Sequence, residues 1–372
     1  MTDTTEMQAH SRAELFLQSV ITGESDGLPT PRSREEKFLK NCAEKCGCDG
    51  LPTPRSRKEQ YLYALAKAVT GTGTEGNNTL NEYLKGTKTD ITAEDLEGVE
   101  TIGEYKFYNS PITSIDIPDS VTSIGNSAFV KCSSLKSVNI GKGVLNIGEA
   151  VFQNSSLVTI VIPDNVTSIG YAPFFECKSL KTIRLSDSLT NIYSICYGCS
   201  SLTSVNIPKN VTSIGERAFR ACTSLSEIEI PDGITSIDRG AFCDCAKLSE
   251  ITLPDSITNI AVEAFMSAGL NKIVIPNGVT SINWHTFIYC TKLAEVVIHS
   301  GVTDIVTQAF MGCSALKKVV CLAETPPTLA SDSFSGVPAD CVFEVPSASV
   351  EAYKAAPNWI ARADYIVAKE GT

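Results

Sequence analysis

The sequence predicts an α/β protein whose main part is a β-rich, right-handed solenoid, preceded by a small helical module. Two repeats of different length lead to this expectation. An isoleucine returns every 22 or 23 residues through most of the chain, and a shorter repeat with helix-capping residues occupies residues 1–71. A chain of 372 residues would ordinarily form two or three globular domains, but a fixed period of this length is typical of stacked repeats.

The longer repeat has several fixed positions. Its isoleucine column consists of Ile102, Ile124, Ile147, Ile169, Ile192, Ile214, Ile237, Ile260, Ile282 and Ile305. In the clearest copies, at 202–222 and 225–245, Leu-x-x-Ile-x-Ile (with Val205 at position 4 of the first copy) precedes Pro, and Ala-Phe-x-x-Cys closes the unit. Leu at position 1 and Ile at positions 4 and 6 predict the buried side of a short strand, which Pro at position 7 ends because it lacks the ladder N–H. The pattern predicts a leucine-rich-repeat solenoid over residues 91–335.

This repeat resembles the BspA-like, or treponemal-type, leucine-rich repeat. The resemblance covers roughly residues 91–335, and the segment VFEVPSASVEAYKAAPNW at 342–359 is similar to the strand-and-helix cap that often closes such arrays. The resemblance therefore implies a C-terminal cap over residues 336–372. Members of this family are typically bacterial surface or secreted proteins that act in adhesion and host-protein binding. A binding module is the function that the resemblance implies.

The shorter repeat lies in residues 1–71. GLPTPRSREEKFL at 27–39 returns as GLPTPRSRKEQYL at 50–62, and SRAELFL at 11–17 is a third, shorter copy. Each copy keeps a Ser-x-x-Glu capping box, and Pro-x-Pro precedes the two longer ones, so each of those predicts an extended arm followed by a short helix. Such helices are marginal alone, so the module either mediates self-association or docking, or only caps the array. These units also resemble segments of phage or prophage minor structural proteins.

Charge and composition exclude several classes of partner. The net charge of −11 argues against binding to nucleic acid or to anionic membranes. No apolar run is long enough to insert into a membrane, and no signal peptide is visible, so the compartment stays open between the cell surface and a phage particle. Residues 72–90 are rich in Gly, Thr and Asn and are expected to be a linker. Its G-x-G-x-x-G, from Gly71 to Gly76, follows a predicted helix instead of a strand and does not predict nucleotide binding.

Half of the 14 cysteines occupy one column of the repeat. These are Cys132, Cys177, Cys199, Cys222, Cys245, Cys290 and Cys313. Equivalent positions on neighbouring strands lie about 4.8 Å apart, but their parallel Cβ vectors give poor disulfide geometry. We expect free, buried thiols that fill space in the core.

No arrangement of residues predicts catalysis. The three histidines, His10, His285 and His299, lack the nucleophile and the orienting third group that a catalytic triad needs. The Cys-x-x-x-Cys-x-Cys run at 42–48 lacks the second pair of ligands that zinc sites use. We therefore expect no enzymatic activity, no metal and no cofactor.

The outward side of the predicted strands carries the candidate partner-binding residues. Positions 2, 3 and 5 are expected to project from a concave sheet. In the middle of the array this face is acidic, through Glu227, Glu229 and Glu250. Farther along, position 5 carries a valine strip and position 3 carries charged residues beside it: Val274, Val297 and Val320, with Lys272, Glu295 and Lys318.

The valine strip has two interpretations. It is either an exposed patch for a partner, since soluble proteins seldom leave stacked apolar residues unused, or it is covered by the C-terminal helix around Tyr353 and Trp359. The face as a whole suits a protein or glycan ligand. The sequence thus predicts a non-catalytic, adhesion-type binding module. The alternative is a structural or assembly component, such as a phage tail-associated protein or a spacer.

Overall fold

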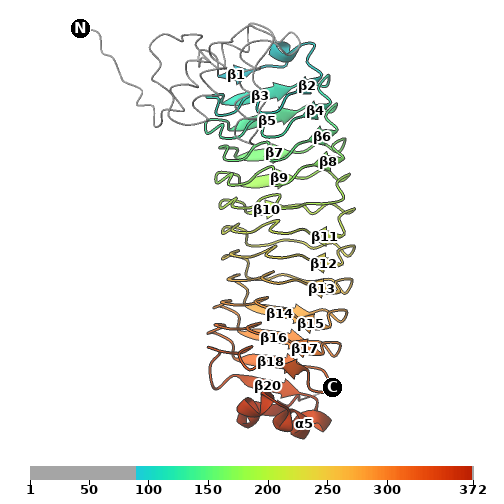
Figure 1. The fold of residues 1–372 in the computed structure, drawn as a ribbon, viewed down its shortest axis with the longest axis vertical. Coiled ribbons are helices and arrows are strands. Elements are labelled where there is room, and N and C mark those ends of the chain that lie inside the picture. The colour runs from blue at the N-terminus through green and yellow to red at the C-terminus, as the bar shows by residue number, and fades with distance from the viewer. Residues whose placement is uncertain (1–88, 371–372) are drawn as a thin grey trace, which may run out of the picture.

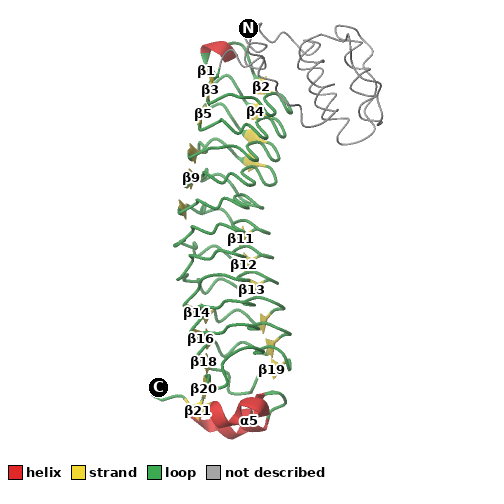
Figure 2. Ribbon diagram, turned by 90° about the vertical axis from the view of Figure 1, so that its left-hand side faces the viewer, coloured by secondary structure: helices red, strands yellow, loops and turns green. Residues whose placement is uncertain are grey.

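The structure is a computed structural model that describes residues 89–370. The module predicted for residues 1–71 and nearly all of the linker lie outside the described residues. The described part is a long, nearly straight column of stacked turns with a small helical end (Figure 1). Figure 2 shows that successive turns place strands on two sides of this column. The chain is therefore a β-solenoid, as the repeat period predicts.

One side of the column carries the longer strands, which we call the wide ladder. Its strands are β1 (Asp90–Ile91), β3 (Ser114–Ile117), β5 (Ser137–Ile140), β7 (Thr159–Val161), β9 (Thr182–Arg184), β10 (Ser204–Val205), β14 (Lys272–Ile275), β16 (Glu295–Ile298), β18 (Lys318–Cys321), β20 (Val342–Val345) and β21 (Ile366–Ala368). Within three sheets, β1-β3-β5, β7-β9-β10 and β14-β16-β18-β20-β21, the strands pair in parallel with the equivalent residues of the next turn, as in Ile115 with Val138. β3 and β14 end directly before Pro118 and Pro276, but β5 and β16 end at the same position before Gly141 and His299, so the strand ends there with or without proline.

The other side carries two-residue strands, which we call the narrow ladder. These are β2 (Thr101–Ile102), β4 (Ser123–Ile124), β6 (Asn146–Ile147), β8 (Ser168–Ile169), β11 (Ser213–Ile214), β12 (Ser236–Ile237), β13 (Asn259–Ile260), β15 (Ser281–Ile282), β17 (Asp304–Ile305) and β19 (Thr328–Leu329). Most of them end on a member of the isoleucine column. The column thus faces the core from the narrow ladder, where these isoleucines are all at most 7% exposed.

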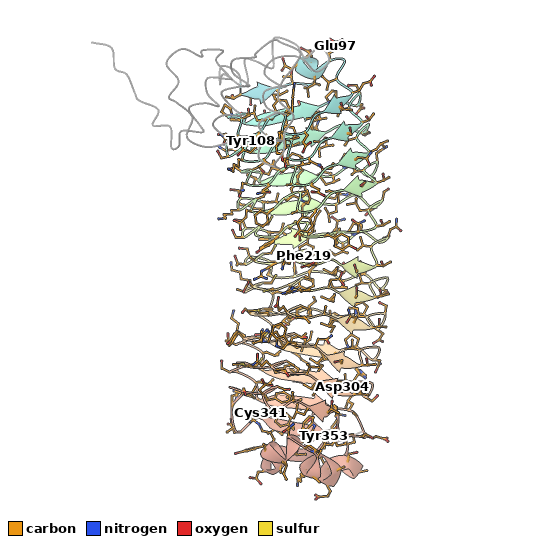
Figure 3. The ribbon with its side chains drawn as sticks, in the orientation of Figure 1. Glu97, Tyr108, Phe219, Asp304, Cys341 and Tyr353 are labelled. Atoms are coloured by element: carbon orange, nitrogen blue, oxygen red, sulfur yellow. The ribbon has the colours of Figure 1, made fainter. Side chains whose placement is uncertain are left out.

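Phenylalanine rings form a stack through the core. The stacked rings are Phe107, Phe129, Phe152 and Phe174, then Phe219, Phe242, Phe265, Phe287, Phe310 and Phe334. Neighbouring ring centroids lie 5.1–5.7 Å apart, and the rings are within 17° of parallel. Phe219 is seen inside the column in Figure 3. Cys196 occupies the position between Phe174 and Phe219, so the stack is divided into two parts.

The cysteine column is buried and free, as predicted, but its thiols do more than fill space. Each Sγ donates a hydrogen bond to a backbone carbonyl of the preceding turn, as Cys132 does to Phe107 at 2.8 Å and Cys245 to Phe219 at 3.1 Å. These carbonyls lie in the turn that follows the narrow ladder. The column therefore satisfies buried acceptors at regular intervals along the stack.

We expect the column thiols to react slowly in the native protein. Burial raises the pKa of Cys132 and of Cys313 to about 12, so little thiolate exists at pH 8. The pKa of these thiols is higher in the folded protein than in the unfolded chain. Their contribution to the free energy of unfolding is therefore retained below about pH 8.5 and falls as the pH rises above that value. Site-resolved mass spectrometry after maleimide labelling should show these cysteines modified only in denaturant. A Cys222–Cys245 disulfide in native protein would contradict this expectation.

The C-terminal end of the column is closed by short helices. After β20 come η2 (Ser347–Ser349), α5 (Val350–Ala355) and η3 (Trp359–Tyr365), and β21 then pairs with β20; η1 (Glu94–Leu96) lies near the other end. Tyr353 and Trp359 are fully buried against the last turns. Tyr353 Oη donates to the carbonyl of Ala323 at 2.8 Å, and Trp359 Nε1 donates to that of Pro327 at 2.8 Å. The helices thus cover the open end of the core.

Candidate functional site

The outward side of the wide ladder has the alternation that the sequence predicts. In β14, Ile273 and Ile275 are at most 1% exposed, whereas Val274 between them is 43% exposed. In β14, positions 3 and 5 thus face solvent, and positions 4 and 6 face the core. The column is nearly straight, so this face is flatter than the predicted concave sheet (Figures 1 and 2).

The wide ladder is interrupted in the middle of the column. Between β10 and β14 lie two turns, 225–231 and 248–254, that form no strand. Within the described residues, the backbone N–H groups of Glu227 to Ile230 and of Glu250 to Leu253 make no backbone hydrogen bond. On the opposite side β11, β12 and β13 pair across these turns, and the narrow ladder is interrupted between β8 and β11 and between β13 and β15. Across the two turns at 225–231 and 248–254, strand pairing is therefore lost on the wide-ladder side and kept on the narrow-ladder side.

Side chains at these turns disfavour strand pairing. Asn206 follows β10, and its side chain bonds to both the N–H and the carbonyl of Leu185 in the preceding turn, at 2.7 and 3.1 Å. These bonds replace the backbone pairing of Leu185 with the turn of β10, which pairs with β9 over two residues only. Glu227 and Glu250 then occupy position 3 of successive turns, and like charges directly opposite each other destabilise a strand pair. By contrast, Lys272 and Glu295 form an ion pair of 3.0 Å across the intact step from β14 to β16.

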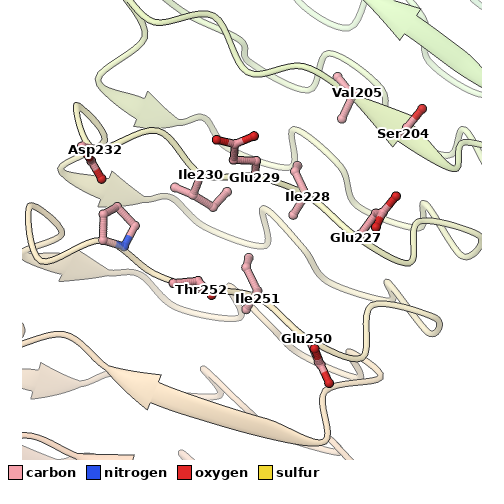
Figure 4. A pocket seen from close by; sticks show the side chains of 11 residues that line it. Ser204, Val205, Glu227, Ile228, Glu229, Ile230, Asp232, Glu250, Ile251 and Thr252 are labelled. Atoms are coloured by element: carbon pink, nitrogen blue, oxygen red, sulfur yellow. The ribbon is translucent and has the colours of Figure 1, made fainter.

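The interruption creates a groove on this face, which we call the acidic groove (Figure 4). Its volume is about 570 Å³, and it is lined by Ser204, Val205, Glu227, Ile228, Glu229, Ile230, Asp232, Glu250, Ile251, Thr252 and Pro254. Val205, Ile228 and Ile251 occupy position 4, which is buried in the intact turns, yet here all three are half-buried. The floor of the groove is therefore apolar and accessible.

The rim of the groove carries unpaired negative charge. Glu227, Glu229, Asp232 and Glu250 are exposed, and none of these carboxylates forms an ion pair or side-chain hydrogen bond with another residue that the structure describes. An apolar floor, free backbone N–H groups and a carboxylate rim can together hold an extended cationic segment. Sequence reasoning found the three glutamates as an acidic stretch. It missed the groove, because only the loss of strand pairing creates it.

The valine strip is exposed at one end and buried at the other. Val274, Val297 and Val320 lie side by side in register, as expected from their spacing. Val274 is 43% exposed, Val297 is half-buried and Val320 is 4% exposed. Tyr353 and Trp359 of the C-terminal helices instead pack at the end of the core. Lys318, two residues before Val320 on β18, forms an ion pair of 2.8 Å with Glu344. Glu344 lies directly opposite Val320 on β20.

Substitutions along the valine strip should therefore differ in cost. Val274→Asp is expected to change the free energy of unfolding by no more than about 0.5 kcal/mol, as exposed positions generally do. Val320→Asp places a carboxylate at a buried position and should lower the free energy of unfolding by at least about 2 kcal/mol. Denaturant titration of both variants measures the difference. Equal costs at the two positions would mean that the strip is uniformly exposed or uniformly covered.

The described residues offer little for catalysis. Within residues 89–370, no group of three or more His, Cys, Asp and Glu side chains is placed to hold a metal ion. His285 stacks on Trp284 and bonds to Gln308 at 2.6 Å, so its ring is held by a neutral partner. His10, the cysteines at 42–48 and the Gly71–Gly76 run lie outside the described part of the chain. No helix in that part is long and apolar enough to cross a membrane.

The stacked parallel turns place this chain among the repeat proteins that form β-solenoids. The model of the BspA-type leucine-rich-repeat region matches residues 100–225 and 193–317. These ranges span more than half of the chain, and the protein belongs to this family. The N-terminal units of residues 1–71 lie outside the matched ranges, and no match supports a resemblance to phage structural proteins.

Solved structures show the same fold. The chain is 26% identical to a leucine-rich-repeat protein from Bacteroides ovatus, covering 77% of this chain and 67% of that one, with a TM-score of 0.50. It is 19% identical to the pneumococcal vaccine antigen PcpA, with coverage of 76% and 79% and a TM-score of 0.52. A leucine-rich cell surface protein from Faecalibacterium prausnitzii is 26% identical, with coverage of 77% and 92% and a TM-score of 0.40. No curated protein sequence matches this chain.

Proposed function

We propose that this protein is a non-catalytic, adhesion-type binding module that uses the wide-ladder face to hold a protein ligand. The acidic groove is the observation that carries the proposal. The ligand is an extended segment with Lys or Arg side chains, which pair with Glu227, Glu229, Asp232 and Glu250 around the rim. Its apolar parts contact Val205, Ile228 and Ile251 on the floor, and its carbonyls accept from the free backbone N–H groups.

A protein ligand suits this site better than a glycan. Neutral sugars are usually held by aromatic faces and paired polar groups, whereas the groove lining contains no aromatic residue. A cationic segment gains from each carboxylate, and such pairing speeds the encounter and weakens as salt rises. The exposed end of the valine strip, at Val274, extends the same face beyond the groove and forms part of the proposed contact. Lys272, Glu295 and Lys318 lie beside it.

Binding of a fluorescein-labelled decalysine peptide tests this proposal. We expect the wild-type chain to bind it and the affinity to fall as salt rises. Glu229→Lys together with Glu250→Lys should weaken binding at least tenfold. Glu97→Lys with Glu324→Lys is the matched control, because it changes the net charge equally at exposed positions away from the groove. Equal losses in the two double variants would show a general charge effect and overturn the proposed site.

A further inference from the structure

We infer that the acidic groove is occupied in the full chain by a segment of the same chain, the basic arm at residues 50–58. Its sequence is GLPTPRSRK, which carries Arg55, Arg57 and Lys58 and no acidic residue. The inference rests on the proposed function, since it uses the same groove. It goes further by naming a partner and a regulatory consequence. An outside ligand must displace the arm before it can bind.

The chemistry of the arm matches the groove. Three cations face four unpaired carboxylates, those of Glu227, Glu229, Asp232 and Glu250. Pro52 and Pro54 favour an extended backbone and have carbonyls but no N–H to donate. The groove offers the complement, because its free backbone N–H groups need acceptors.

The apolar residues of the arm match the floor. Leu51 and the two prolines can contact Val205, Ile228 and Ile251, which are half-buried where intact turns bury the same position. Covering this floor removes apolar surface from water. The related arm at residues 27–35 is less suited, because it carries two arginines and ends in Glu35.

The arm can reach the groove within one chain. The described chain begins at Thr89, directly before β1, which belongs to the same wide ladder as the groove. From β1 to the turn of Glu227 there are six ladder steps, or about 29 Å at the usual strand spacing. The 31 residues from Lys58 to Thr89 can span up to about 100 Å when extended. Attachment to the same chain keeps the arm at high effective concentration.

Hydrogen exchange in the full chain tests the inference. We compare the wild type with an arm-reversed variant, Arg55→Glu, Arg57→Glu and Lys58→Glu, and follow exchange in residues 225–231 and 248–254. The free N–H groups of an empty groove exchange fast, so arm reversal should speed exchange there at least tenfold. Arg32→Glu with Arg34→Glu is the matched control and should leave the rates unchanged. Equal rates in the wild type and the arm-reversed variant would overturn the inference.

A charge swap gives a second, independent test. Glu227→Lys, Glu229→Lys and Glu250→Lys reverse the charge of the groove rim and should release the wild-type arm. Combining them with the arm reversal should restore slow exchange, whereas continued fast exchange contradicts the pairing. The rates should be the same at 1 and 100 µM protein. Protection that grows with concentration would mean that the arm binds a second copy, which contradicts docking within one chain.

Failure of this inference can be told apart from failure of the proposed function. Decalysine added to the arm-reversed variant should slow exchange in the groove and bind more tightly than to the wild type, because no arm competes. If decalysine binds both proteins equally well at the groove, the groove is a binding site but the arm does not occupy it. If it binds neither, both the function and the arm docking are wrong.

Discussion

Phe242→Ala should lower the free energy of unfolding by about 3–5 kcal/mol, the usual cost of removing a fully buried ring. Phe242 is 0% exposed and stacks between Phe219 and Phe265, with centroid distances of 5.7 and 5.4 Å. Each turn of a solenoid contacts only its neighbours, so the cavity weakens two adjoining interfaces at once. Denaturant titration followed by circular dichroism measures the loss.

The matched control for this substitution is Tyr289→Ala. Tyr289 is 46% exposed and belongs to the same turn-forming part of the repeat. Its replacement should change stability by no more than about 0.5 kcal/mol. A loss at Phe242 as small as the loss at Tyr289 would show that the phenylalanine stack does not hold the turns together. We also expect the transition to broaden in Phe242→Ala, since turns on the two sides of the cavity become less coupled.

Trp359→Ala should cost about 3–5 kcal/mol, because this residue closes the end of the core. Its ring is 0% exposed and lies 5.0 Å from Tyr353 and 5.8 Å from Phe343, centroid to centroid. Its Nε1 donates to the carbonyl of Pro327, which loses its partner in the variant. Thermal unfolding should begin at the C-terminal turns, with early loss of exchange protection in β18 and β20.

Ile360→Ala is the control for the cap. Ile360 directly follows Trp359 in η3 but is 63% exposed, so its truncation should be nearly neutral. If Trp359→Ala is equally neutral, the C-terminal helices cover the end of the column without stabilising it. A solenoid with an unsealed end exposes a row of apolar side chains, so we also expect Trp359→Ala to aggregate more readily than Ile360→Ala.

The groove and the intact end of the wide ladder differ in a few side chains. From β14 to β18, position 3 alternates in sign through Lys272, Glu295 and Lys318, and the strands pair over four residues. In the turns at 225–231 and 248–254, the same position carries Glu227 and Glu250, and no strand forms. The same repeat therefore yields either a paired sheet or an open site, and the like charges of Glu227 and Glu250 disfavour pairing at the central step of the open region.

The sequence by itself determined the class of fold and most of its faces. The isoleucine period predicted the stacking, and the alternation around Val274 predicted that this side chain faces solvent and its two neighbours face the core. Such features are readable because each turn repeats the same local constraints, so one period describes them all. The acidic character of Glu227, Glu229 and Glu250 was equally visible. Binding of a ligand there, and the role of residues 1–71, stay predictions.

Only the tertiary structure shows at which turns the strand pairing and the burial differ from the repeat pattern. The hydrogen bonds of the Asn206 side chain to Leu185, the loss of strand pairing at the groove, and the burial of Val320, two strands from the exposed Val274, all depend on contacts between turns. The cysteine column likewise proved to be a row of hydrogen-bond donors, because its carbonyl partners belong to the preceding turn. A periodic sequence specifies each turn in isolation. Whether two neighbouring turns pair as strands depends on side chains some 22 residues apart in the sequence, which meet only after folding.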